Sequence, residues 1–172
     1  MANNKQDRTG KLIITGAPPG YSEFKVLACE YAVERPMNGG EPYGSPALRN
    51  NCIKLTVETT KGVKFLRDWA LGEKEQWGII SLVIAAGTKG SINRKMRYIY
   101  FGGKISKIEE DFSNHSQQMM ATTLYIHPVS VTFTESDGKG IRLLTRKGKV
   151  VENVNVDLTA SKLPIYIDDY TF

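Results

Sequence analysis

The sequence lacks a hydrophobic run long enough to span a membrane. Its longest apolar stretch, residues 79–86, is interrupted by Ser81 and has the length of a β-strand, whereas a membrane-spanning helix needs about 20 apolar residues. The first ten residues, MANNKQDRTG, are polar and do not contain the apolar core of a signal peptide. We therefore expect a cytoplasmic protein that leaves the cell only if a dedicated machine exports it.

Cysteine and histidine are scarce, with two of each in 172 residues. No CxxC or HxxxH spacing groups them, so no metal site is predicted. Strand alternation places Leu27, Cys29, Tyr31 and Val33 on one apolar face. On the next predicted strand, the apolar face is formed by Ile53, Leu55 and Val57. Cys52 therefore points to the opposite face. We therefore expect two free thiols and no disulfide, as in a reducing compartment.

Recognisable catalytic motifs are also missing. His115 lies in a polar loop, and His127 precedes Pro128 without a GxSxG motif or a suitably placed cysteine. The acidic run 109–111 has the character of a solvated strand end, and no glycine-rich turn leads into GKS or GKT. The sequence predicts neither an enzyme nor a cofactor. A small hydrolase with His127 or Glu109 in a cleft is the least favoured alternative.

A strong excess of one charge is absent as well. The formal net charge is +5 and the pI is about 9.1, which on its own says little about partners. One basic group, Arg94, Lys95 and Arg97, is followed by Tyr98 and Tyr100. Basic residues at a strand end also prevent unwanted edge pairing, and we favour that interpretation. A nucleic-acid-binding β-barrel that uses Arg94, Arg97, Tyr98 and Tyr100 stays open as an alternative of another class.

Most of the chain has the alternating pattern of β-strands. Between residues 60 and 71 the period changes to that of a helix, which Gly72 can end. The predicted strands are 11–15, 23–34, 51–59, 78–86, 94–101, 104–112, 118–127 and 129–133. Gly102 and Gly103 predict a tight turn between two of them, and Pro128 predicts a bend or bulge.

The helix carries one apolar stripe. This stripe predicts that the helix is pinned onto the sheet. Its members are Val63, Phe65, Leu66 and Trp69.

The loop 35–50 (RPMNGGEPYGSPALRN) is the most unusual segment. It contains three prolines and three glycines between two well-patterned strands. Loops longer than about 12–15 residues are usually functional or disordered. Because catalytic motifs are missing, the loop favours a role in assembly.

The order of these segments resembles a known family. The series VLACEYAVERPMNGGEPYGSPALRNNCIKLTVET, TKGVKFLRDWAL, GIISLVI, MRYIYFGGKISKIEEDFSN and MMATTLYIHPVSVTF is similar to the haemolysin-coregulated protein family, the tube proteins of type VI secretion systems, particularly the TssD form of Bacteroidetes. The resemblance covers about residues 11–133.

The resemblance implies a mainly β fold, a two-sheet β-barrel with one flanking α-helix, related to phage tail tube subunits. It implies homohexameric rings that stack into an inner tube, with contractile sheath, spike and effector proteins as partners and no membrane insertion. A tube subunit of a phage-tail-like or extracellular injection particle is the alternative. The loop would be the arm that reaches the adjacent ring. Its implied stacking residues are Arg35, Pro36, Met37, Asn38, Glu41, Tyr43, Pro46, Leu48 and Arg49.

Three segments are expected from these patterns. Residues 1–10 form a flexible tail, and residues 11–133 form the barrel domain. Residues 134–172 extend past the usual end of the family and are predicted to contain a small hairpin packed on the barrel or on a neighbour. They are too short to bury much core alone.

Overall fold

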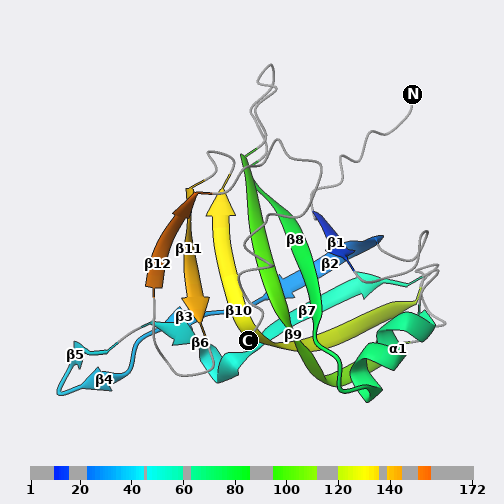
Figure 1. Cartoon of the computed structure of the whole chain (residues 1–172), viewed down its shortest axis with the longest axis horizontal. Helices are drawn as coiled ribbons and strands as arrows, with labels where there is room; N and C mark the ends of the chain where they lie inside the picture. Colours follow the sequence, from blue (N-terminus) through cyan, green and yellow to red (C-terminus); the bar gives the residue numbers. More distant parts are fainter. Residues whose placement is uncertain are drawn as a thin grey trace.

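The computed structural model describes residues 10–15, 23–44, 46–59, 63–85, 95–111, 120–135, 139–144 and 151–155. Six of the strands in these ranges form a closed antiparallel barrel in the order β10-β7-β2-β1-β8-β9, and the pairing of β9 with β10 closes it (Figure 1). The prediction of a mainly β barrel with one flanking helix is confirmed. The barrel strands are β1 (Gly10–Ile14), β2 (Glu23–Glu30), β7 (Ile53–Glu58), β8 (Gln76–Ala85), β9 (Lys95–Asp111) and β10 (Ala121–Glu135).

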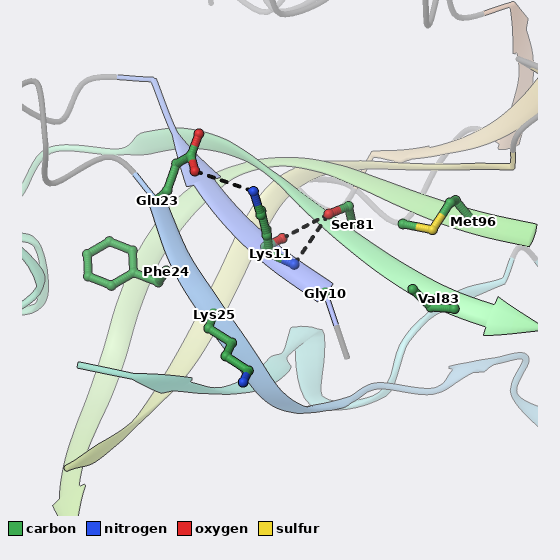
Figure 2. A pocket seen from close by; sticks show the side chains of 8 residues that line it. All are labelled: Gly10, Lys11, Glu23, Phe24, Lys25, Ser81, Val83 and Met96. Atoms are coloured by element: carbon green, nitrogen blue, oxygen red, sulfur yellow. Dashed lines mark hydrogen bonds and ion pairs between the residues drawn. The ribbon is translucent and has the colours of Figure 1, made fainter. Parts of the chain in front are cut away.

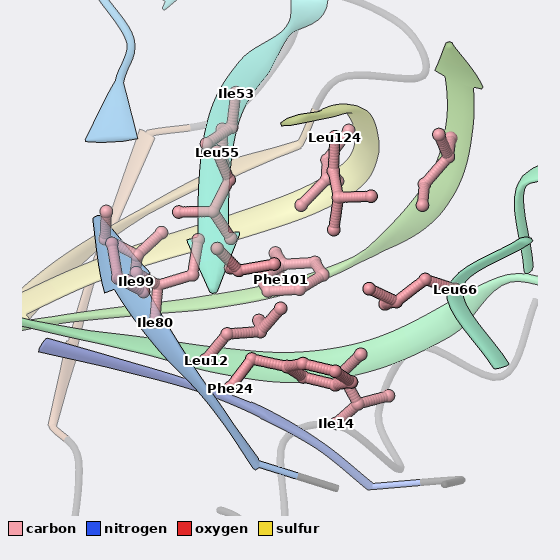
Figure 3. Packing of buried hydrophobic residues seen from close by; sticks show 14 of the residues in the cluster. Leu12, Ile14, Phe24, Ile53, Leu55, Leu66, Ile80, Ile99, Phe101 and Leu124 are labelled. Atoms are coloured by element: carbon pink, nitrogen blue, oxygen red, sulfur yellow. The ribbon is translucent and has the colours of Figure 1, made fainter. Parts of the chain in front are cut away.

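The core fills the inside of the barrel with alternate residues of these strands (Figure 3). On β7, the side chains of Ile53, Leu55 and Val57 are fully buried, as their alternation predicts. Leu124 and Ile126 of β10 are fully buried from the neighbouring strand. Burying a side chain of this size stabilises the fold by about 1.5–3 kcal/mol. The alternation of apolar residues along the strands therefore predicts which side chains fill the barrel.

The strand β2 differs from the prediction. It ends at Glu30 rather than at residue 34, and the register with β7 shifts between Val26 and Ala28. Such a bulge inserts one residue and reverses the facing of those that follow. Val26 is therefore buried, Leu27 is 40% exposed, and Cys29 again packs against the core. The prediction that Leu27 and Cys29 share a buried face is wrong for this reason.

The strand β9 is one continuous element of 17 residues. The predicted turn at Gly102 and Gly103 is wrong, because both glycines pair with β8 and with β10. A Cβ atom on Gly102 would lie 2.1 Å from the Trp77 ring, and one on Gly103 would lie 2.4 Å from the His127 carbonyl oxygen. These glycines allow close approach of neighbouring groups.

The strand β10 is also continuous, from Ala121 to Glu135, through Pro128. Its register with β9 shifts between Pro128 and Ser130, so the predicted bulge at this proline is confirmed. The first half of β10 pairs with β7 and the second half with β11 (Lys139–Leu144). β12 (Val151–Asn155) continues this sheet outward as the second strand of a hairpin. The division of the chain into tail, barrel and extension stays a prediction.

The helix α1 (Val63–Leu71) lies beside the barrel against β9 (Figure 1). Leu66 and Trp69 are buried, and Phe65 packs partly buried against the same core. The indole Nε1 of Trp69 donates a hydrogen bond to the carbonyl oxygen of Gly103 at 3.2 Å, and its ring stacks on Phe101 with centroids 6.3 Å apart. Residues 60–62 and the side chain of Val63 lie outside the described residues.

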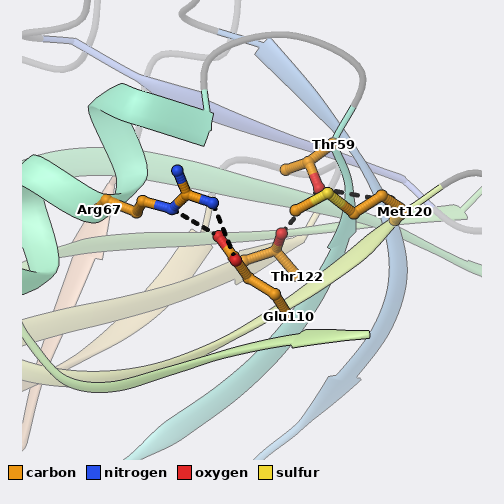
Figure 4. A network of polar contacts seen from close by, with 5 residues as sticks. All are labelled: Thr59, Arg67, Glu110, Met120 and Thr122. Carbon is orange, nitrogen blue, oxygen red and sulfur yellow. Dashed lines mark hydrogen bonds and ion pairs between the residues drawn. The ribbon is translucent and has the colours of Figure 1, made fainter. Parts of the chain in front are cut away.

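Polar contacts also attach the helix to β9 (Figure 4). The guanidinium of Arg67 donates two hydrogen bonds to Glu110 of β9, at 2.8 and 2.9 Å. Because of this bidentate contact, the pKa of Glu110 is lowered. Beside it, the hydroxyls of Thr59 and Thr122 lie 2.7 Å apart and are buried.

Candidate functional site: a projecting arm and the pocket at its root

The predicted loop folds as an arm made of two short antiparallel pairs that project from the barrel (Figure 1). Gly39 and Gly40, both with positive φ, form the turn at its tip. The inner pair is β3 (Val33–Glu34) with β6 (Ala47–Leu48), and the outer pair is β4 (Met37–Asn38) with β5 (Glu41–Pro42).

The arm is anchored at its root. Leu48 is buried in the core, and the backbone N–H of Arg49 donates to the carbonyl oxygen of Ala32 at 2.8 Å. The Arg49 guanidinium also contacts the Glu34 carboxylate at 3.1 Å. These contacts hold the two strands of the arm together at its root and attach the arm to the core.

The outer part of the arm is exposed. Met37 is 62% exposed and Tyr43 is 54% exposed. Arg35, Pro36, Asn38 and Glu41 are exposed as well, and Pro46 is partly buried. The outer part of the arm therefore presents two large side chains with apolar surface to solvent.

A pocket of about 500 Å³ lies at the root of this arm. We call it the root pocket. Within it, the Ser106 hydroxyl and the His127 Nε2 are 2.6 Å apart. Its lining residues are Glu30, Tyr31, Ala32, Arg49, Asn50, Cys52, Lys54, Ser106, Tyr125 and His127.

Two lysines flank Tyr125, which lines the root pocket together with one of them, Lys54. Lys54 and Lys107 lie over the Tyr125 ring, with Nζ atoms 5.9 and 5.1 Å from its centroid. These residues are direct cross-strand partners on β7, β10 and β9. Glu109 accepts hydrogen bonds from Lys107 and from the Tyr125 hydroxyl, and the contact with Lys107 is the main reason why the pKa of Glu109 is lowered.

The hydrolase hypothesis receives no support from this geometry. His127 does line the root pocket, but Glu109 is bonded to Lys107 and Tyr125 rather than to the imidazole. Burial raises the pKa of the Cys29 thiol to about 12 and raises that of Cys52, so neither free thiol has the lowered pKa of a catalytic nucleophile. Within the described ranges, no group of three or more potential metal ligands is present.

The nucleic-acid hypothesis fails at its aromatic residues. Tyr100 is 5% exposed, so it cannot stack on a base. Tyr98 is partly buried, and Arg97 donates a hydrogen bond to the Tyr31 hydroxyl at 3.2 Å. Arg94 lies outside the described residues. The three described residues do not form an exposed cationic and aromatic patch.

A second pocket of about 500 Å³ lies where β1 begins (Figure 2). Its charged pair, Lys11 and Glu23, is exposed with 3.7 Å between Nζ and Oε2. Val83 and Met96 supply an apolar wall from β8 and β9. This pocket has no counterpart among the residues that the sequence analysis singled out.

The comparison with protein families decides the identity. The family described as "Hemolysin coregulated protein Hcp (TssD)" matches residues 6–139. The chain belongs to the Hcp family. Hcp proteins are structural tube components of type VI secretion systems rather than enzymes, so the resemblance seen in the sequence is confirmed.

Solved Hcp structures share the fold. Hcp1 from Flavobacterium johnsoniae is 16% identical, with a TM-score of 0.58 over 80% of this chain and 99% of that one. Hcp1 from E. coli EAEC 042 is 10% identical, with a TM-score of 0.56 over 86% and 98%. Hcp1 from Salmonella typhimurium is 8% identical, with a TM-score of 0.56 over 85% and 98%. No curated protein matches the chain.

The root pocket is the feature that sequence reasoning missed in this Hcp chain. Lys54, Ser106 and Tyr125 each occupy an outward position on a different strand. Alternation gives the facing of each residue, but it does not give the register between strands that brings the three together.

Among the described residues, no helix is long and apolar enough to cross a membrane.

Proposed function

We propose that this Hcp tube subunit assembles into hexameric rings that stack to form the inner tube of a type VI secretion system. The sheath and spike act on the stacked tube, effectors travel in its lumen, and the subunit itself is exported. The proposal rests on the family match and on the barrel fold. Rings with a lumen are the arrangement in which such a subunit can carry cargo.

The arm is proposed as the contact that holds neighbouring rings together. The observation that carries this step is the exposure of Met37 and Tyr43 on an anchored hairpin that projects from the barrel. Burying two such side chains against a neighbour would gain about 1.5–3 kcal/mol each. Several copies per ring would act together, so modest contacts would give a stable stack.

The test replaces the two exposed arm side chains with serine, Met37→Ser with Tyr43→Ser. We expect rings to form while stacks shorten or disappear, because the substitutions leave the barrel core intact. Sedimentation velocity and negative-stain imaging measure both states.

The matched control is Leu71→Ser, which removes another exposed large apolar side chain, 85% exposed, outside the arm. The control is expected to stack like the unchanged protein. Stacks of unchanged length in the arm variant would refute this role for the arm.

A further inference from the structure

The last part of the chain and the root pocket have no assigned role. The family match ends at residue 139, whereas the sequence continues to residue 172. The segment 164–172, PIYIDDYTF, carries two aspartates and three aromatic residues, with no lysine or arginine. We call it the acidic segment. A surface of the barrel that binds this segment has to offer positive charge and aromatic contacts.

The root pocket has the complementary chemistry. Arg49 and Lys54 contribute cations, and their side chains are 61% and 42% exposed. The Lys54 ammonium lies 3.9 Å from Glu30, at the outer limit of an ion pair, so a better-placed carboxylate can compete for it. Tyr31 and Tyr125 offer aromatic surface. Hydrogen-bonding groups of Asn50, Ser106 and His127 complete the lining.

The chain is long enough to connect the two. β12 ends at Asn155, and Asp168 follows 13 residues later. Thirteen extended residues span about 43 Å, and a compact domain of this length is about 40 Å across. A pocket of 500 Å³ is also within the range of about 300–1,000 Å³ that holds small ligands or a few side chains.

We propose that the acidic segment docks into the root pocket of its own chain, with Asp168 and Asp169 facing Arg49 and Lys54. The docked segment would cover the base of the arm and sit against the residues that orient it. This inference goes beyond the proposed ring assembly and does not depend on it, because it concerns a contact within one copy.

The native Cys52 gives a direct test, since it lines the root pocket. In a Cys29→Ala background, Thr171→Cys adds one thiol to the acidic segment. The matched control, Thr159→Cys, places the thiol in the same part of the chain but outside that segment. Disulfide formation, with dissolved oxygen as the oxidant, is followed on non-reducing gels at low protein concentration and pH 8.5. Because the pKa of Cys52 is raised, all arms use the same pH.

We expect Thr171→Cys to form the intramolecular crosslink at least about tenfold faster than the control, because docking raises the effective concentration of the two thiols. Adding Lys54→Glu, replacing both aspartates by asparagine (Asp168→Asn with Asp169→Asn), or raising the salt concentration to about 0.5 M should each slow it. Asp157→Asn, outside the acidic segment, should leave the rate unchanged.

Three results would overturn the proposal. Equal rates for Thr171→Cys and Thr159→Cys would show that the acidic segment has no preference for the root pocket. A rate insensitive to Lys54→Glu would remove the charge argument. Covalent dimers in place of the intramolecular crosslink would assign the pocket to a second copy. Ring formation measured on the same variants reports separately on the proposed function.

Discussion

At the scale of single residues, Gly102 shows how the closed barrel depends on a missing side chain. It lies within a strand that pairs on both sides, and the Trp77 ring covers the place where a Cβ would be. Pairs of glycines are a strong turn signal in a sequence. In this protein Gly102 and Gly103 lie within a strand and permit close packing. This role becomes visible only when the neighbouring strands are placed.

Replacing this residue, Gly102→Ala, should destabilise the fold by about 1–3 kcal/mol, because the added methyl group overlaps the indole of Trp77. Urea unfolding measures the change. Adding Trp77→Leu should recover part of the loss, since the smaller side chain leaves room for the methyl group. A Gly102→Ala protein with an unchanged urea midpoint would contradict the close contact.

At the scale of elements, the sequence was sufficient for most strands and for the helix. Alternation identified β7, and a stripe of helical period identified α1, with Leu66 and Trp69 buried as a packed stripe requires. The limits came from local irregularities. The bulge after Val26 and the continuity of β9 depend on pairing with strands distant in the sequence, which periodicity along one segment does not reveal.

The attachment of α1 to β9 should depend on pH through Glu110. The Arg67 contact lowers the folded-state pKa of Glu110 below its ordinary value of 4.5. A carboxyl group with a lowered pKa stabilises the folded state above that value, and its contribution is lost as the pH falls through the folded pKa. We therefore expect Glu110→Gln to lower the urea midpoint at pH 7.

The difference between Glu110→Gln and the unchanged protein should shrink as the pH falls below 4.5, the ordinary pKa of the carboxyl group, and should be lost below the lowered pKa of the folded state, where the group is protonated in both states. Glu73→Gln, at an exposed glutamate beyond the end of the helix, serves as the control and should have little effect at either pH. If the Glu110→Gln difference were the same at pH 7 and pH 3, its cause would not be the ion pair.

At the scale of the whole molecule, the residues alone predicted a β-rich unit, a long arm and no catalytic centre. The helix was predicted from its own apolar stripe, whereas the barrel came from the resemblance, and the structure confirms both. The closure of the barrel between β9 and β10 joins two strands that are consecutive in the chain. The root pocket instead combines the base of the arm with residues of four strands, β2, β7, β9 and β10, so its composition required the fold.

The central claim is that copies of this barrel join into rings with a central channel. Negative-stain imaging of the purified full-length protein tests it most directly. The account predicts six-fold rings with a central hole, and stacks of such rings at higher concentration. Single barrels throughout, even in concentrated samples, would contradict it.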